Sequence, residues 1–594
     1  MVRGVRLDHD QHRRSAMLIR AAAVVTAAIT PLSLVTATLP ARAAEPAATV
    51  VPLQVTGDPA KRFNLVVLGD GYTEADMPAF RQNVDKHLNV LWSIEPYKSY
   101  RSYINVYRVE IPSKVSGVSC DPGVTDARKD TPLGMSFWSG CRTDGIQRLL
   151  VMNEDAANTY ANLVKGVPAA NRQVLALANS TTYGGAGGSY ATASGGNAMS
   201  ALISPHELGH SVGGLDDEYD YYYRGVPGGT YDGGEPDSLH HTLLTEDQMR
   251  RRHLKWWRWL GERSEAGGTI GRYEGGMYYS KGIWRPSAHS IMKQLGYYYD
   301  QVSRERMTQA ISAKVDLIQD GTPEGTVGAD RVLSVETLHP VDHALRVAWT
   351  VDGRPVRAGH DLDLRRLRLR PGVHKVDVRV DDPTAFIRDP AVRASFARTR
   401  SWTVDTSVRT PPDATSPGFG TTTPTDRPVA ARSVIGVETT HPATSAPHVE
   451  WRVDGRPVNA DRDLRLPPLR PGTHHVTARV GDQTRTWTVD ATPPTVTAQA
   501  QQPPAGDQLT LKLTPSDDQA GYVVAEFRVD GDGWYNYYGW PTDSTRPFLF
   551  TKTGTTIDNL VYGRLAAGRH TIEYRAIDAA GNYGKPRTVT VTLR

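Results

Sequence analysis

The sequence predicts a multidomain protein in which an α/β (α+β) domain is followed by three all-β sandwich modules. A chain of 594 residues is too long to fold around one hydrophobic core, so several domains are expected. Up to about Asp320, apolar strand-like runs alternate with segments of helical periodicity, which is typical of an α/β arrangement. Beyond that residue, short strand-like runs with turn signals recur almost intact, which indicates duplicated β-sandwiches.

Residues 1–43 have the pattern of a secretory signal peptide. Five arginines precede an uncharged, mostly apolar or small-residue run over 21–39, and Ala41-Arg42-Ala43 supplies an A-x-A cleavage site. A transmembrane anchor is the alternative, which the prolines, alanines and threonines of the run disfavour. No later segment is apolar enough to span a bilayer. We therefore expect a secreted, extracellular protein that begins near Ala44.

Charge and cysteine content narrow the possible partners. The formal net charge of +4, from 68 basic and 64 acidic residues, is too balanced to indicate a nucleic-acid partner. The chain has two cysteines, Cys120 and Cys141, which in an exported protein can close one loop as a disulfide. They are too few to supply the four ligands of a cysteine-zinc site.

Residues 44–320 are expected to form the first domain. Strands are predicted at 63–68, 103–111 and 173–178, and helices at 146–164, 246–260 and 300–318. A helix also follows the first strand, with Thr73 or Asp76 as its cap and Pro78 in its first turn. In the glycine-rich stretch 183–192, a strand at 189–193 could form the sheet edge that pairs with a polypeptide substrate, the alternative being a surface loop.

The chemistry is concentrated in the sequence His206-Glu207-Leu208-Gly209-His210. On a helix the two histidines lie one turn apart on the same face, so both imidazoles can bind one zinc ion, Zn2+. Glu207 can then reach a water on the metal and act as the general base. Pro205 either starts this helix, with Ser204 as its cap, or kinks a longer helix that begins near Met199.

A third ligand has to come from beyond the helix. Gly213 permits the chain to turn back, because glycine accepts the positive φ that ends a helix. Asp216, ten residues after His206, is the favoured third metal ligand. Asp217 and Glu218 also carry carboxylates in the same turn, so either of them could replace it.

The extended stretch HELGHSVGGLDDEY resembles the metzincin clan of zinc peptidases, and more closely the IgA-peptidase family of secreted bacterial metallopeptidases. The resemblance covers Arg62 to Ile318 and includes Leu68-Gly69-Asp70-Gly71-Tyr72-Thr73 and Tyr273-Glu274-Gly275-Gly276. It implies a metzincin-like domain, with His206, His210 and Asp216 holding zinc. Ser290-Ile291-Met292 is the candidate methionine turn, in which the methionine packs beneath the metal.

The residues after the methionine turn depart from the family pattern. Relatives often carry a tyrosine soon after the methionine turn that assists the oxyanion, whereas Lys293 and Gln294 follow here. Tyr297, Tyr298 or Tyr299 could take that role. His240 and His241 are adjacent and cannot both face one ion comfortably, so they are interpreted as non-ligands.

The tail contains a duplication and a third module. Modules are expected at 329–405 and 432–492, joined by a Pro/Thr-rich linker at 406–431, and at 493–594. The duplicated copies share Trp-x-Val-Asp-Gly-Arg-Pro, in which Asp-Gly is a hairpin turn. The third module looks like bacterial extracellular Ig-like domains. Its dense aromatics, Trp534, Tyr535, Tyr537, Tyr538 and Trp540, are either buried strand residues or a stacking platform for glycans.

These observations favour a secreted zinc-dependent endopeptidase that hydrolyses extracellular proteins by metal-activated water, with Glu207 as general base. The alternative is a non-catalytic adhesion or glycan- or protein-binding protein built on the Ig-like modules. Glu207 argues against that alternative, because a binding protein has no use for a base beside the metal. The natural substrate is left open.

Overall fold

A computed structural model describes residues 48–594, except 222–225, 412–415, 442–443, 503–506, 520, 540–544 and 558–559. The predicted signal peptide at 1–43 lies outside the described residues. The chain from Ala47 to Arg594 forms one compact unit. No helix in the described part of the chain is long and apolar enough to cross a membrane.

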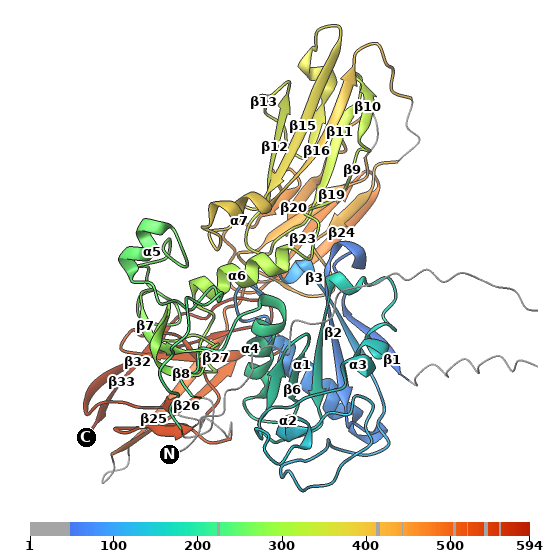
Figure 1. Ribbon diagram of the computed structural model, residues 1–594. Coiled ribbons are helices and arrows are strands. Elements are labelled where there is room, and N and C mark those ends of the chain that lie inside the picture. The colour runs from blue at the N-terminus through green and yellow to red at the C-terminus, as the bar shows by residue number, and fades with distance from the viewer. Residues whose placement is uncertain are drawn as a thin grey trace, which may run out of the picture. The chain divides into compact units, whose positions relative to one another are not determined.

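A mixed, mostly parallel sheet of six strands organises the first domain, in the order β1-β3-β2-β4-β6-β5 (Figure 1). The strands are β1 Thr49–Gln54, β2 Phe63–Asp70, β3 Ile104–Glu110, β4 Arg172–Ala178, β5 Gly185–Gly187 and β6 Ala191–Ser194. The four central strands are parallel, and β1 and β5 run antiparallel at the two edges. The edge strand is therefore β5, and the strand predicted at 189–193 corresponds to β6, which lies inside the sheet.

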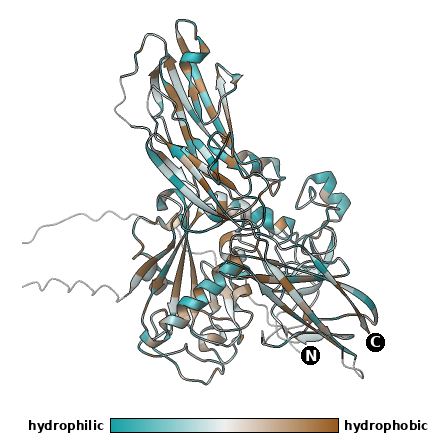
Figure 2. Cartoon of the chain, turned by 180° about the vertical axis from the view of Figure 1, so that it is seen from behind, coloured by the Kyte–Doolittle hydropathy of each residue, from teal (hydrophilic) through white to brown (hydrophobic). Residues whose placement is uncertain are grey.

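Helices cover both faces of this sheet. Leu65 and Val67 of β2 belong to a core that includes α1 (Met77–Leu91) and α4 (Ser200–Gly213), while Val66 and Leu68 pack with α3 (Glu154–Ala161). This alternation follows from the twofold side-chain period of a strand, and burial on both faces explains its continuous apolar sequence. Several strands of this sheet are brown in the hydropathy view (Figure 2).

Three helices are shorter than predicted. The helix expected at 146–164 is α3 alone, because Leu149 and Val151 form β-bridges with Gly185 and Ser136 before Asn153 caps the helix. The other two are α5, Glu246–Arg252, and α6, Gln301–Ser312. Between them lies a hairpin of β7, Tyr273–Gly276, and β8, Tyr279–Arg285. A single distorted turn, α2 (Phe137–Cys141), carries Cys141, which forms a disulfide with Cys120.

The first tail module is a sandwich of two sheets, with orders β10-β16-β15-β12-β13 and β14-β11-β9. Its elements are β9 Ile318–Gly321, β10 Gly325–Gly328, β11 Val332–Thr337, β12 Arg346–Val351, β13 Arg354–Val356, β14 Asp361–Asp363, β15 Val373–Asp381, α7 Pro390–Ser395 and β16 Ala397–Asp405. The module starts at β9, before the expected boundary at 329. Residue 318 was expected to end a helix, but it is the first residue of β9 and pairs with Thr337 of β11.

The second module repeats this topology, with orders β18-β24-β23-β20-β21 and β17-β19-β22. Its strands are β17 Phe419–Thr422, β18 Val429–Ala430, β19 Val434–Thr439, β20 Glu450–Val453, β21 Arg456–Val458, β22 Asp463–Arg465, β23 Thr473–Val480 and β24 Gln483–Asp490. Two of its strands, β17 and β18, lie inside the expected linker at 406–431. The Asp-Gly turns have positive φ at both residues, 49° and 75° at Asp352 and Gly353, as a type I′ hairpin requires.

The third module has sheets β25-β26-β29 and β28-β27-β32-β33 and a small β30-β31 ribbon. Its strands are β25 Thr495–Gln501, β26 Gln508–Ser516, β27 Val524–Val529, β28 Tyr535–Asn536, β29 Phe548–Thr551, β30 Thr555–Ile557, β31 Leu560–Tyr562, β32 Gly568–Ile577 and β33 Arg587–Leu593. Trp534 and Tyr535 are buried, as expected for strand aromatics and not for a glycan platform. Trp540 lies outside the described residues.

Candidate metal centre

The histidine motif lies on α4, which has Met199 as its N-cap and contains Pro205 within it. Of the two predicted helix starts, the longer helix is therefore the observed one. The residue that ends the helix in the left-handed region is Gly214, with φ 61°, and not Gly213, which is still helical. The amide of Gly214 bonds to the carbonyl of His210 at 2.8 Å, and the chain then returns toward the helix.

Both motif histidines are hydrogen-bonded through Nδ1, and their Nε2 atoms face each other. Nδ1 of His206 bonds to the carbonyl of Ile291 at 2.9 Å, and Nδ1 of His210 bonds to the carbonyl of Leu215 at 2.6 Å. A carbonyl only accepts, so Nδ1 of each ring carries the proton and Nε2 is left with a lone pair. The two Nε2 atoms lie 3.3 Å apart.

The carboxylate beside these nitrogens belongs to Asp217. Its Oδ1 lies 3.2 Å from Nε2 of His206 and 3.4 Å from Nε2 of His210. Asp216, the favoured third ligand, is exposed and does not join them. The backbone explains the difference in placement, since the amide of Asp216 bonds to His240 Nε2 at 2.9 Å and that of Glu218 bonds to the Met292 carbonyl at 3.0 Å. These two anchors turn the residue between them toward the imidazoles.

The three groups fit a cation. Oδ1 of Asp217 is buried without a hydrogen-bond donor, and it faces two imidazole lone pairs. Buried acceptors that converge in this way need a positive charge between them. A proton on Nε2 of His210 can supply that charge when no metal is bound, because burial, which lowers the pKa of His210, is outweighed by Asp217, which raises that pKa to about 10. The site therefore stabilises a positive charge, and a histidine, histidine and carboxylate set is one that zinc accepts.

Glu207 lies next to this group on α4. Its Oε2 is 4.0 Å from Nε2 of His210, and burial raises its pKa, against the opposing effect of the two imidazoles. The edge strand β5 passes close by, because a Cβ atom added to Gly185 would lie 3.0 Å from Oε1 of Glu207. A carboxylate is thus available between the candidate metal ligands and the edge of the sheet.

Residues 290–292 pack against the helix that carries the motif, α4. Met292 is fully buried, and a Cβ atom added to Gly209 would lie 2.7 Å from its sulfur. The preceding carbonyl, that of Ile291, is the one that holds His206. The segment predicted as a methionine turn therefore packs against α4 at the histidines.

Tyrosines near the imidazoles come from unexpected positions. The Tyr219 hydroxyl lies 3.2 Å from Nε2 of His206, and the Tyr278 hydroxyl donates to Oδ2 of Asp217. The predicted candidates bond elsewhere: Tyr299 to the Pro205 carbonyl and Tyr298 to Glu526. Tyr219 is the last residue of the motif stretch, so the sequence could have indicated that it lies near the histidines. Tyr278 lies on the β7–β8 turn, far from the motif in sequence, and no sequence pattern indicates its position.

A second group of Asp216, His240 and His241 lies beside the first, with potential ligand atoms within 4.8 Å of one another. Protein groups already occupy both nitrogens of His240, since Nε2 accepts from Asp216 and Nδ1 faces Glu218 Oε1 at 3.1 Å. Nδ1 of His241 lies 2.9 Å from the Ser238 hydroxyl. These contacts leave no free nitrogen on His240, whereas Nε2 of His241 has no hydrogen-bond partner in the described structure, so the interpretation of both histidines as non-ligands stays a prediction.

Residues 51–266 match the family model described as IgA Peptidase M64. No curated protein shows a significant match to the chain.

Several solved structures are similar to parts of the chain. Fibronectin(III)-like modules of Clostridium thermocellum CbhA are 17% identical and cover 30% of this chain and 94% of that chain, with a TM-score of 0.17. Drosophila OTK extracellular domains 3–5 are 11% identical, covering 46% and 96%, with a TM-score of 0.17. The N-terminal four Ig domains of Dscam1 isoform 6.9 are 12% identical, covering 46% and 72%, with a TM-score of 0.21.

Proposed function

We propose that the chain, in which residues 51–266 match the IgA peptidase M64 family model, is a secreted, zinc-dependent endopeptidase with a metzincin-like catalytic domain. The observation that carries the proposal is the convergence of three acceptors, Nε2 of His206, Nε2 of His210 and Oδ1 of Asp217, with Glu207 beside them. His206, His210 and Asp217 would hold the metal. When bound, zinc supplies a Lewis acid that polarises the scissile carbonyl and acidifies the attacking water.

Glu207 is the general base of this proposal. Its carboxylate accepts a proton from the attacking water and then passes it to the nitrogen of the leaving amine. Helix α4 holds it in place, because the same turn carries both histidines. Its burial keeps bulk water from competing for that proton.

Two hydroxyl groups are placed to act on the substrate carbonyl. Tyr219 and Tyr278 each present an O–H within the group of His206 and Asp217, so either can donate to an oxygen that becomes negatively charged. This role takes the place of the one expected for Tyr297 to Tyr299. Tyr278 also orients Asp217 through their hydrogen bond.

The substrate is proposed to be an extended polypeptide that lies along β5. This strand is at the edge of the sheet and next to Glu207, and extended peptides commonly bind by adding to such an edge. The small residues Gly185, Ala186 and Gly187 allow the substrate backbone to approach closely.

Secretion is supported by the disulfide between Cys120 and Cys141, because disulfides persist in oxidising compartments. The signal-like pattern of residues 1–43 agrees with it. Comparing the N-terminus of protein recovered from the culture medium with that of the cell-associated protein tests this part, and a medium lacking the protein would contradict it.

The catalytic proposal is tested by hydrolysis of an unfolded protein substrate by the wild type and by Glu207→Gln. We expect the variant to lose about a thousandfold or more in kcat/KM while it keeps its metal and its fold, because only the base is removed. Glu154→Gln, at an exposed position at the start of α3, is the matched control and should leave the rate unchanged. Equal rates for Glu207→Gln and the wild type would remove the catalytic assignment.

A further inference from the structure

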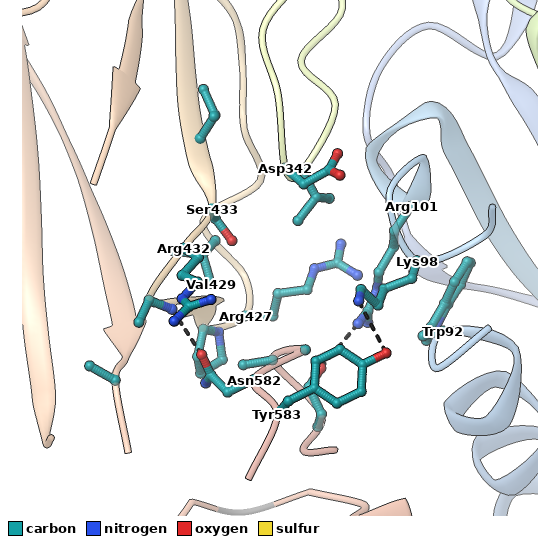
Figure 3. Close-up of a pocket in the computed structure, with 18 of the residues that line it drawn as sticks. Trp92, Lys98, Arg101, Asp342, Arg427, Val429, Arg432, Ser433, Asn582 and Tyr583 are labelled. Carbon is teal, nitrogen blue, oxygen red and sulfur yellow. Dashed lines mark hydrogen bonds between the residues drawn. The ribbon is translucent and has the colours of Figure 1, made fainter. Parts of the chain in front are cut away.

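A cavity of about 580 Å³ lies away from the candidate metal centre, and none of the metal-centre residues lines it. Its walls come from four regions: Trp92 to Ser102 of the first domain, His339 to Asp342 of the first module, residues 423–434 of the second module, and residues 579–586 of the third module (Figure 3). This volume is within the range of small-molecule sites.

Two arginines from different regions meet at one neutral atom in this cavity. Nε of Arg101 donates to Oε1 of Gln54 at 3.1 Å, and Nη1 of Arg427 donates to the same oxygen. Gln54 is only 3% exposed, and its amide nitrogen bonds to the carbonyls of Arg101 and Ile104 at 2.9 and 2.7 Å. These bonds fix the amide with its oxygen toward the guanidinium groups.

The positive charge at this point is not balanced. The other contacts of Arg101 are neutral: the Ala579 carbonyl at 3.2 Å and the face of Trp92 at 4.9 Å. Among the described residues, no carboxylate forms an ion pair with Arg101, and Arg427 has one only in Asp426, at 3.1 Å. Burial, followed by the Arg427 guanidinium, holds the pKa of Arg101 well below its usual value. Two partly buried guanidinium groups therefore share one neutral acceptor and a single carboxylate, so a further negative charge would stabilise them.

Further donors line the same cavity. Lys98 Nζ lies 3.3 Å from the Tyr583 hydroxyl, 4.4 Å from the centre of its ring, and 3.4 Å from Glu95. Ser433 is 3% exposed, and its hydroxyl is buried without a hydrogen-bond partner in the described structure. A buried hydroxyl without a protein partner is available to hydrogen-bond a water molecule or a bound group.

We propose that this cavity binds a small multivalent oxyanion, whose oxygen atoms bridge Arg101 and Arg427 and reach Lys98 or Ser433. Guanidinium groups bind phosphate, sulfate and carboxylate through paired, charge-assisted hydrogen bonds, so these groups share the required chemistry. The bound anion would link the first domain to the second module, because Arg101 and Lys98 come from the former and Arg427 and Ser433 from the latter. This site is independent of the peptidase proposal.

The test is isothermal titration of the full-length chain at constant ionic strength with inorganic phosphate, sulfate and succinate, which separate the three possible oxyanion groups. We expect saturable binding of at least one probe and a rise in thermal unfolding temperature with it. Arg427→Gln should weaken that binding about tenfold or more, since it removes one of the two guanidinium groups. Arg456→Gln, on an exposed hairpin of the same module, is the matched control and should bind as the wild type.

Arg427→Lys controls for a folding defect in Arg427→Gln. It keeps the positive charge and removes only the planar guanidinium group. Its affinity should lie between those of the wild type and Arg427→Gln. The proposal is overturned if no probe binds saturably to the wild type. It is also overturned if Arg427→Gln, with a wild-type circular dichroism spectrum, binds as tightly as Arg456→Gln.

Discussion

Two neighbouring groups in the first domain each combine two imidazoles with one aspartate, yet they differ in which atoms are free. In the group of His206, His210 and Asp217, protein carbonyls take both Nδ1 atoms, and the Nε2 atoms face each other and a carboxylate oxygen without a donor. In the group of Asp216, His240 and His241, the two nitrogens of His240 are already bonded. Residue type and proximity therefore do not identify a metal site, whereas the direction of the unoccupied nitrogens does.

The group of Asp216, His240 and His241 positions the turn that carries Asp217. His240 links the side chain of Glu218 to the backbone of Asp216, and both residues flank Asp217. Glu218 and His240 are almost completely buried, so this link is held firmly. A positioning role of this kind is typical of the residues around metal ligands. The comparison can be tested by variants that change one group at a time.

The largest effect is expected when a facing imidazole is removed. His210→Ala should lose metal and reduce kcat/KM by about a thousandfold or more, because Nε2 of His210 is one of the three converging acceptors. Metal content after dialysis and hydrolysis of an unfolded protein measure the two losses together. A variant with full metal content would show that His210 is not a ligand.

The next effect distinguishes two adjacent aspartates. Asp217→Ala should lower metal affinity by about a hundredfold or more, whereas Asp216→Ala should keep its affinity within about threefold, because only Asp217 reaches the imidazoles. Competition with a chromogenic chelator gives both affinities. The reverse order would restore the ligand set expected from the motif spacing.

A smaller effect is expected from the positioning link. His240→Ala should lower metal affinity about ten- to a hundredfold, because the turn that carries Asp217 loses an anchor. His240→Gln can still accept from the Asp216 amide and should recover part of the loss. Equal metal affinities for His240→Ala and the wild type would mean that the turn carrying Asp217 keeps its conformation without His240.

The smallest effect on the metal is expected at His241. This side chain is fully buried, with Nδ1 near Ser238 and Nε2 without a described partner. His241→Gln should leave metal affinity within about threefold of the wild type and change the unfolding free energy by about 1–3 kcal/mol. Chemical denaturation and the chelator assay measure these separately, and a large loss of metal would assign His241 to the centre.

The sequence was informative where its pattern depends on local or repeated features. The buried strand β2 follows from an apolar run, the duplicated modules follow from the repeat, and His206, Glu207 and His210 follow from helical spacing. The choice between Asp216 and Asp217 could not be made in this way. It depends on the backbone bonds to His240 and Met292, which are remote in sequence.

Other differences have the same origin. The helix expected at 146–164 begins only after Asn153, because the preceding residues bridge to β5 and to Ser136. The start of the first sandwich at β9 and the contribution of Tyr278 both depend on pairing with distant segments. A single sequence contains no local signal for such pairings.

Anomalous diffraction at the zinc edge from crystals of the full-length protein tests the central claim most directly. We predict one strong peak within about 2.0–2.2 Å of Nε2 of His206, Nε2 of His210 and Oδ1 of Asp217. A peak among Asp216, His240 and His241, or no peak near either group in zinc-supplied crystals, would contradict it.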